Sequence, residues 1–380
     1  MYNRKLVFSA ACMSIFLFGA GLITLGAVVP ELKKKFDLDE ISAGTLFSIL
    51  PLGILTGSLL FGPIADRYGY RLVLAIACLF MFGGFEGIAG ANSLIVLKAA
   101  VFLFGTGGGA INGGTSSVIA DISKSKGPAL SLLGVFFGLG ALSMPFILAI
   151  LQHIFSFSAI IATVGFVTLL SALFFLLLHF PPAKQKNGFP LAKGLGLLKD
   201  GTLLLIAFFL FCQSSFEGIV NNWTTSYLIQ HLTIAENKAL YALTLYLTGM
   251  TISRLLIGTV FRNIASFKLL YASFVLILAG CVLLQTSTSF IMAVTGLILF
   301  GGGLGGGFPI MLGLVANRYA ELSGTAFSLV LVIALIGNML INYLMGLVAQ
   351  NYGIRHLITF TFAELMAMVC ICLLIARKIK

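Results

Sequence analysis

Long apolar runs recur along this chain, and they restrict its possible folds more than any other feature. Each run reaches about 20 residues, the length at which a helix crosses the hydrocarbon core of a bilayer. Membrane-spanning strands are only about 10 residues long and alternate in polarity, which these runs do not. The sequence therefore predicts an all-α membrane protein with twelve transmembrane helices, at residues 6–29, 42–62, 72–91, 95–119, 128–151, 157–180, 202–229, 238–260, 268–286, 290–315, 324–349 and 356–376.

The composition agrees with a surface that faces lipid. Only 9% of the residues are charged and 59% are hydrophobic, whereas soluble domains carry about 25% charged residues. The net charge of +11 does not indicate nucleic-acid binding, because the basic residues are scattered in short loops and form no stripe. The six cysteines lie inside apolar runs without metal-site spacing. We expect them to be packing residues, and we expect no cofactor.

The distribution of Lys and Arg predicts the orientation. With the N-terminus inside, sixteen of the 23 basic residues fall in inner segments and five in outer segments. Basic residues accumulate on the cytoplasmic side of a membrane protein. Both termini are therefore predicted to be cytoplasmic, and a bacterial inner membrane is the expected location. The polar segment 181–200 lies on the same side.

The two halves of the chain resemble each other at an offset of 196 or 197 residues. Phe104–Gly107 aligns with Phe300–Gly303, and Ala129–Leu132 aligns with Ala326–Leu329. The constant offset predicts two pseudo-symmetric six-helix bundles, at 1–180 and 201–380, joined by a cytoplasmic linker at 181–200. Transporters built from such repeats bind their solute near the membrane midplane and give access to alternate sides.

Three motifs carry a family resemblance. The segment Gly62–Arg71 resembles the G-x-x-x-D-R-x-G-[RK]-[RK] loop signature of the major facilitator superfamily, with Tyr70 at the first basic position. Glu217–Leu228 and Phe136–Pro145 are similar to helices 7 and 5 of the fucose–galactose–glucose:proton symporter branch. The resemblance implies the superfamily fold and a monosaccharide carried with a proton. That branch can hold a coupling carboxylate in helix 1, whereas the first span here has no acid before Glu31.

The candidate solute site centres on Glu217, near the middle of the seventh span. A carboxylate at the bilayer centre costs about 2.5–3.5 kcal/mol, so it must face the protein interior or a wet cavity. Helical spacing places Gln213, Asn221 and Thr224 on the same stripe as Glu217, and such amides and hydroxyls can exchange hydrogen bonds with a polyol. The predicted substrate-binding residues are Gln213, Glu217, Asn221, Trp223, Thr224, Asn112, Asn338 and Asn342. Interhelical hydrogen bonding is the open alternative for the amides, and an interfacial position is the alternative for Trp223.

Several further charged residues are candidates for proton coupling, ion pairing or a latch. Glu217 and Glu364 are candidates for proton coupling, because burial moves a carboxyl group toward neutrality. Glu86 and Lys98 lie at comparable depths near the outer ends of neighbouring spans and are predicted to form a structural pair. The resemblance implies a charge latch at the inner face, with solvated loop charges as the alternative; its residues are Asp66, Arg67, Arg71, Asp121 and Arg254.

Two transport hypotheses remain open. A deep acid among polar amides favours a proton-coupled importer of a sugar or similar polyol. The 34 Phe residues keep open an exporter, by proton antiport, of amphipathic compounds or drugs. An enzyme is not expected, since no metal cluster or Ser/His pair lies at membrane depth. The glycine runs 105–109 and 301–307 lack a Walker Lys-Ser/Thr, which favours helix packing over phosphate binding. The expected partners are a small solute, a proton and lipid, and the expected state is a monomer.

Overall fold

The computed structural model describes residues 3–122, 126–180, 197, 199–261, 263–319 and 323–379. Within these ranges the side chains at 62–63, 66–67, 120–121, 126–128, 130–131, 316, 323–325, 327–328 and 379 are not described. Among the described residues, twelve helical segments are long and apolar enough to cross a membrane, and no strand occurs. The predicted all-helical membrane fold is confirmed.

The chain divides into two compact units. Unit 1 comprises Met1–Leu38 and Leu46–Phe189, and unit 2 comprises Asp39–Thr45 and Pro190–Lys380. The first six helices are α1 (Arg4–Phe36), α2 (Glu40–Tyr68), α3 (Tyr70–Gly90), α4 (Leu94–Ile122), α5 (Lys126–Leu151) and α6 (Phe157–Leu177). The later helices are α8 (Gly201–Gln230), α9 (Glu236–Gly258), α10 (Ser266–Gln285), α11 (Phe290–Leu304), α12 (Gly307–Arg318), α13 (Ser323–Tyr352), η2 (Ile354–His356) and α14 (Leu357–Ile379). Most of the predicted linker 181–200 lies outside the described residues.

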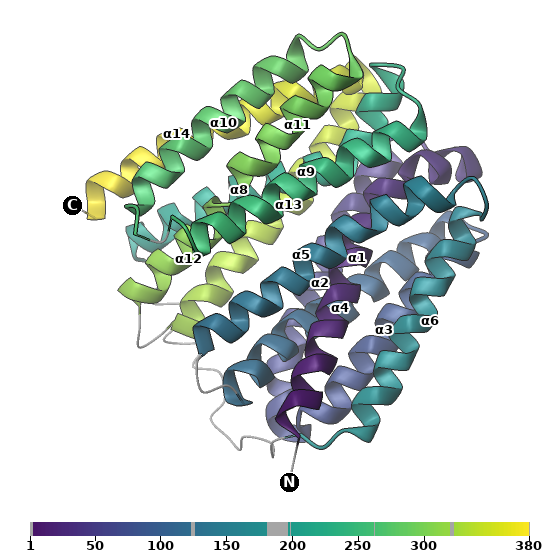
Figure 1. The fold of residues 1–380 in the computed structure, drawn as a ribbon, viewed down its shortest axis with the longest axis vertical. Coiled ribbons are helices and arrows are strands. Elements are labelled where there is room, and N and C mark those ends of the chain that lie inside the picture. The colour runs from purple at the N-terminus through teal and green to yellow at the C-terminus, as the bar shows by residue number, and fades with distance from the viewer. Residues whose placement is uncertain are drawn as a thin grey trace. The chain divides into compact units, whose positions relative to one another are not determined.

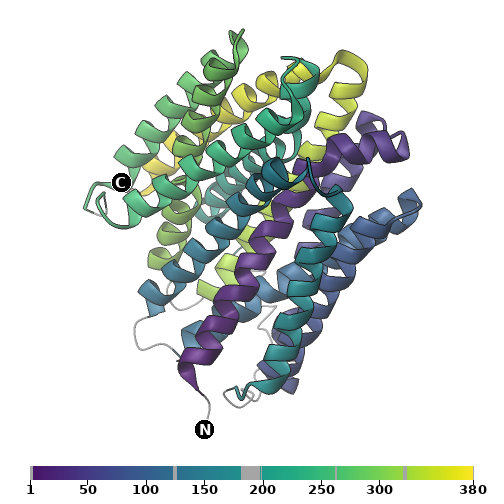
Figure 2. The ribbon, with the colours of Figure 1, turned by 45° about the vertical axis from the view of Figure 1, so that its right-hand side comes forward.

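Helix pairing in unit 1 is repeated in unit 2. In unit 1, α1 packs on α5, and α3 packs on both α4 and α6 (Figures 1 and 2). In unit 2, α8 packs on α13, and α10 packs on both α11 and α14 (Figure 1). Since these are the equivalent helices of the sequence repeat, the two bundles are pseudo-symmetric.

Two equivalent glycines show what the repeated glycine runs do. A Cβ at Gly105 on α4 would lie 2.5 Å from the carbonyl oxygen of Leu50 on α2. A Cβ at Gly301 on α11 would overlap the carbonyl oxygen of Tyr246 on α9. Both members of the second pair lie 196 residues after their counterparts in the first. The glycines therefore permit close helix packing, which is the role predicted for these runs.

The tenth span differs from its predicted form. A continuous helix was expected over 290–315, whereas α11 ends at Leu304 and α12 begins at Gly307. Each glycine in a helix costs about 1 kcal/mol relative to alanine, which weakens the helix at Gly305 and Gly306. Glycine content alone does not explain the break, because residues 105–109 stay helical within α4. Pro309 accounts for the difference, because it has no N–H to donate to the Gly305 carbonyl and its ring clashes with that group, whereas the equivalent position in α4 is Gly113.

Candidate solute and proton site

Glu217 lies near the middle of α8 and is held by two polar side chains of unit 2. Its Oε2 lies 3.4 Å from Nη2 of Arg254 on α9, and its Oε1 accepts a hydrogen bond of 2.8 Å from Nε2 of Gln213. The Glu217 side chain is 15% exposed and that of Arg254 is 33% exposed. A partly buried carboxylate keeps its charge only with such partners, because desolvation alone would favour its neutral form. The pair therefore holds a carboxylate that a proton can neutralise within a membrane-spanning helix.

Several buried polar atoms near this pair lack a hydrogen-bond partner within the described chain. They are Oε1 of Gln213, Oδ1 of Asn221, the hydroxyl of Tyr246 and Nε of Arg254. Tyr246 is fully buried on α9 and interacts electrostatically with both Glu217 and Arg254. Buried polar groups are nearly always hydrogen-bonded in folded proteins. These donors and acceptors are therefore suited to a polar molecule beside the pair.

A second polar group joins α8 to α13. Oδ1 of Asn342 accepts from Trp223 Nε1 at 3.2 Å and from Asn222 Nδ2 at 3.1 Å. Asn342 Nδ2 donates to Asn338 Oδ1 at 3.0 Å, and Asn338 Nδ2 donates to the carbonyl oxygen of Ser214 at 2.8 Å. Neither Trp223 nor Asn342 has any exposed surface. The network brings three predicted solute ligands together, in the geometry of interhelical hydrogen bonding.

Sequence reasoning did not single out two members of this network. Asn222 and Ser214 lie one residue beside the predicted polar stripe of α8, at Asn221 and Gln213. A polar residue next to the stripe points about 100° away from it around the helix. That rotation directs Asn222 and Ser214 toward α13, and only the helix pairing reveals it.

The remaining predicted ligands are spread over both units. Thr224 is buried and donates its hydroxyl to the carbonyl oxygen of Val220 at 2.6 Å, one turn earlier in its own helix. Asn112 on α4 is exposed in unit 1. Glu364 on α14 is 7% exposed and interacts electrostatically with Cys212 on α8. The structure thus places Glu364 against α8 through the residue that precedes Gln213.

The predicted pair between Glu86 and Lys98 is not formed in the structure, which describes both side chains. Glu86 Oε1 is buried without a hydrogen-bond partner, and a Cβ at Gly165 on α6 would lie 2.5 Å from it. Similar depth in the membrane made the pair plausible from sequence. The side chain of Glu86 instead leaves α3 toward α6, and depth says nothing about that direction.

The predicted latch residues are only partly described. Nη2 of Arg71 donates to the carbonyl oxygen of Leu176 at the end of α6. Arg254 pairs with Glu217, so it lies with the candidate solute site rather than in a cluster of loop charges. The side chains of Asp66, Arg67 and Asp121 lie outside the described residues.

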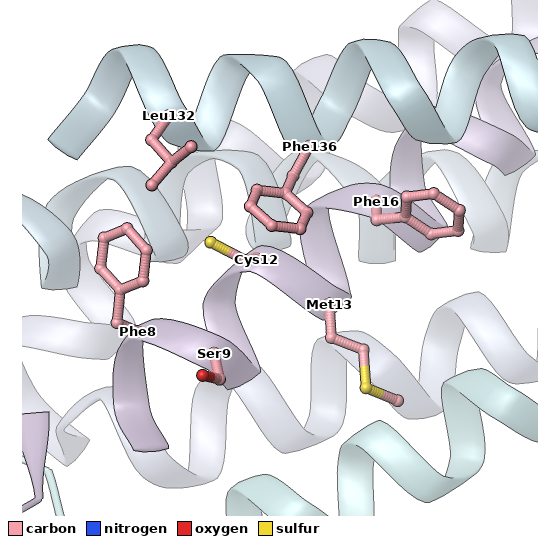
Figure 3. A pocket seen from close by; sticks show the side chains of 7 residues that line it. All are labelled: Phe8, Ser9, Cys12, Met13, Phe16, Leu132 and Phe136. Carbon is pink, nitrogen blue, oxygen red and sulfur yellow. The ribbon is translucent and has the colours of Figure 1, made fainter. Parts of the chain in front are cut away.

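Unit 1 contains an apolar hollow of about 440 Å³ between α1 and α5 (Figure 3). It is lined by Phe8, Ser9, Cys12, Met13, Phe16, Leu132 and Phe136. Figure 3 shows the Cys12 thiol directed between the rings of Phe8 and Phe136. No charged side chain lines this hollow, which suits an aromatic or aliphatic group. No group of three His, Cys, Asp or Glu among the described residues could hold a metal ion.

Comparison with protein families shows which family the chain belongs to. The family model of the Major Facilitator Superfamily matches residues 11–341. The chain belongs to this superfamily. It is therefore a transporter built on the twelve-helix, two-bundle fold of that family.

Individual relatives of this transporter carry different solutes. The 4-hydroxybenzoate transporter PcaK of Pseudomonas aeruginosa is 32% identical over 162 residues, which cover 42% of this chain and 36% of PcaK. The glucose/mannose transporter GlcP of Bacillus subtilis is 26% identical over 346 residues, covering 87% of this chain and 85% of GlcP. The inner membrane transport protein YdiN of Escherichia coli is 23% identical over 380 residues, which cover 96% of this chain and 89% of YdiN.

Solved structures share the fold of this transporter at low sequence identity. The nucleoside transporter NupG is 15% identical, with a TM-score of 0.81 and 99% of each chain covered. A D-xylose–proton symporter is also 15% identical, with a TM-score of 0.81 and 97% of each chain covered. At this identity the likeness concerns the fold alone.

Proposed function

We propose that this transporter moves a small polar solute, with monosaccharides as the substrate class, together with a proton by alternating access. The Glu217–Arg254 pair is the observation that carries the proposal. A proton that binds Glu217 neutralises the carboxylate and releases Arg254 from its charged partner. The free guanidinium can then bond a solute hydroxyl, so proton and solute favour the same state. This differential binding is what coupling requires.

The polar atoms around the pair support a polyol as the solute. Asn221 Oδ1 is an acceptor, Arg254 Nε is a donor, and the Tyr246 hydroxyl serves as both. Each sugar hydroxyl also donates and accepts, so a monosaccharide could satisfy all three atoms. The similarity to the glucose/mannose transporter GlcP over 85% of that protein supports the same substrate class.

A second candidate function is transport of an amphipathic or aromatic solute, including export by proton antiport. The apolar hollow lined by Phe8, Phe16 and Phe136 favours it, because a sugar ring gains little from such a surface. The similarity to the 4-hydroxybenzoate transporter PcaK supports the same class, although the match covers only 36% of that protein.

The remaining parts of the proposal rest on sequence. The basic residues favour cytoplasmic termini. A bacterial inner membrane as the location and one chain as the working unit are proposed with them. Domain limits at 1–180, 181–200 and 201–380 are proposed from the repeat. Proton coupling through Glu364, solute contact by Asn112 and Asn338, and a latch formed by Asp66, Arg67, Arg71 and Asp121 stay predictions.

Proteoliposomes test proton coupling directly. With an acidic exterior, the wild-type protein should concentrate a labelled substrate sugar, and a protonophore should collapse the gradient. Glu217→Gln should lose this accumulation and keep exchange at equal concentrations on both sides. Glu86→Gln makes the same chemical change at a carboxyl outside the ion pair and should accumulate normally. Full accumulation by Glu217→Gln would remove Glu217 from the mechanism.

A binding screen decides between the two substrate classes. Purified protein would be melted with monosaccharides, with aromatic carboxylic acids and with lipophilic cations. Stabilisation by a monosaccharide, lost in Glu217→Gln, supports the sugar proposal. If no monosaccharide stabilises the protein while aromatic acids or lipophilic cations do, the second candidate function replaces sugar transport.

A further inference from the structure

One amide links Glu217 to the break between α11 and α12. Nε2 of Gln213 has two hydrogens, and one is donated to Glu217 Oε1 at 2.8 Å. The other is donated to the carbonyl oxygen of Leu304 at 2.9 Å. Leu304 is the last residue of α11, so its carbonyl lies among those that a helix end leaves without a helical N–H partner. The same nitrogen of Gln213 thus bonds both the carbonyl at the end of α11 and the Glu217 carboxylate.

The other end of this amide is packed against the start of α12. A Cβ at Gly307 would overlap Oε1 of Gln213 and would lie 2.7 Å from its Cδ. Gln213 is only 1% exposed, and its Oε1 has no hydrogen-bond partner. The amide therefore fills the space that Gly307 leaves, with an unused acceptor. A second side chain reaches the end of α11: the hydroxyl of Ser253 on α9 donates to the carbonyl oxygen of Gly302 at 2.7 Å.

We infer that Gln213 is a positioning residue that transmits the charge state of Glu217 to the α11–α12 break. The inference rests on the proposed proton binding at Glu217. When Glu217 is ionised, its carboxylate holds the Nε2 edge of Gln213 in place by a charge-assisted hydrogen bond. When a proton from solution binds Oε1 of Glu217, that oxygen becomes a donor, and its natural acceptor is the unused Oε1 of Gln213. Rotation of the amide by half a turn makes this bond.

The same rotation changes the contact with α11. It replaces the Nε2 donor facing the Leu304 carbonyl with an oxygen, so a hydrogen bond becomes a contact between two acceptors. The break loses a bond and gains a repulsion at the same step. Protonation of Glu217 thus breaks the hydrogen bond between Gln213 and the end of α11. Apart from the bound proton, no covalent bond changes.

Other ionisable groups near α8 define the electrostatic setting. From α9, Arg254 and Tyr246 face Glu217. From α14, Glu364 lies on Cys212. The charged or titratable groups on the other elements packed against α8 are Arg318 of α12, Tyr343 and Tyr352 of α13, and Arg355 and His356 of η2. Among these described groups, Arg254 is the one ion-paired with Glu217, so it opposes protonation most directly.

Hydrogen–deuterium exchange on the full chain in lipid nanodiscs tests the inference at a single pH. The neutral Glu217→Gln side chain mimics the protonated acid, so backbone exchange at residues 301–308 should become about fivefold faster, the effect of one lost hydrogen bond. Residues 105–109, the equivalent unbroken glycine run, should not change. Gln213→Leu should speed residues 301–308 to the same extent, and adding Glu217→Gln to it should have no further effect.

A second variant guards against misfolding of Gln213→Leu. Gly307→Ala displaces the amide without altering either polar residue and should also accelerate exchange at the break. Gly313→Ala, on the same helix with no atom within 4 Å of its Cβ, is the matched control and should not. Wild-type exchange at 301–308 in Glu217→Gln would overturn the inference. If that variant also lost accumulation, the proposed proton coupling would stand without the amide; normal accumulation would instead defeat the proposed coupling.

Discussion

The indole N–H of Trp223 is bonded to Oδ1 of Asn342 at 3.2 Å, and neither side chain is exposed. Trp223 is the only tryptophan in the chain, so fluorescence reports this one contact between α8 and α13. Asn342 also accepts from Asn222 and donates to Asn338. The Asn342 side chain thus links Trp223, Asn222 and Asn338 in one network between α8 and α13.

Loss of this connection should be visible in both stability and fluorescence. Asn342→Ala removes the oxygen that accepts from the Trp223 indole N–H and from the Asn222 amide, and losing such buried hydrogen bonds costs about 1–3 kcal/mol of unfolding free energy. Acrylamide should barely quench the wild-type protein and should quench the variant more strongly. Asn351→Ala is the control, because Asn351 is exposed and bonds only the Leu347 carbonyl in its own helix. Unchanged quenching in Asn342→Ala would contradict the described network.

Removal of one partner of the Glu217–Arg254 pair should harm the protein more than removal of both. Arg254→Gln leaves a partly buried carboxylate without its cation, at a cost of about 3–5 kcal/mol. The double variant Glu217→Gln with Arg254→Gln carries no unpaired charge and should recover most of that loss. Thermal unfolding in detergent measures the difference. Strictly additive effects would show that the two residues do not interact.

A methyl group at Gly218 should disrupt the contact of α8 with α13. Its Cβ would lie 2.7 Å from Cγ of Asn338. Gly218→Ala must displace that amide, and overpacking of this kind costs about 1–3 kcal/mol. The melting temperature should fall, whereas Gly313→Ala, a helical glycine with open space around its Cβ, should not lower it and should raise it slightly through its higher helix propensity. Equal melting temperatures for the two variants would refute the packing described for Gly218.

The start of α8 should contribute stability that depends on pH. Asp200 accepts from the backbone N–H of Thr202 at 2.7 Å and of Leu203 at 3.3 Å. Burial disfavours the carboxylate, but these bonds and the nearby Tyr319 and Arg318 outweigh it and lower the pKa of Asp200 below its usual value of 3.8. The stabilisation is present above the unfolded-state pKa and is lost as pH falls through the folded-state pKa.

Chemical unfolding at several pH values tests this cap. At neutral pH, Asp200→Ala should cost about 1 kcal/mol, the usual value of a helix N-cap. The difference from wild type should shrink as the pH falls below about 4. Asp200→Asn should keep much of the cap and lose the pH dependence. A deficit in Asp200→Ala that stays constant down to pH 2 would rule out the ionised carboxylate as its source.

The sequence by itself determined the properties that depend on residues close together in the chain. Apolar runs of bilayer length predicted the twelve spans, because every backbone polar group in lipid must be satisfied within a helix. The constant offset of the glycine runs predicted two similar bundles. The loop motif at Gly62–Arg71 indicated the superfamily, and the insertion cost of a lone acid singled out Glu217.

Only the tertiary structure decided which neighbour each polar side chain meets. Helical periodicity places Glu217 on one stripe of α8, but the packing of α9 brings Arg254 to it. Glu86 and Lys98 share a depth, yet Glu86 turns to α6 because depth does not define rotation about a helix axis. Pro309 disfavours a continuous helix after Leu304, and its counterpart in α4 is Gly113. Only the packing of α8 shows that Gln213 bonds the freed Leu304 carbonyl. Partners from distant segments are chosen by helix packing, and one-dimensional patterns do not contain that choice.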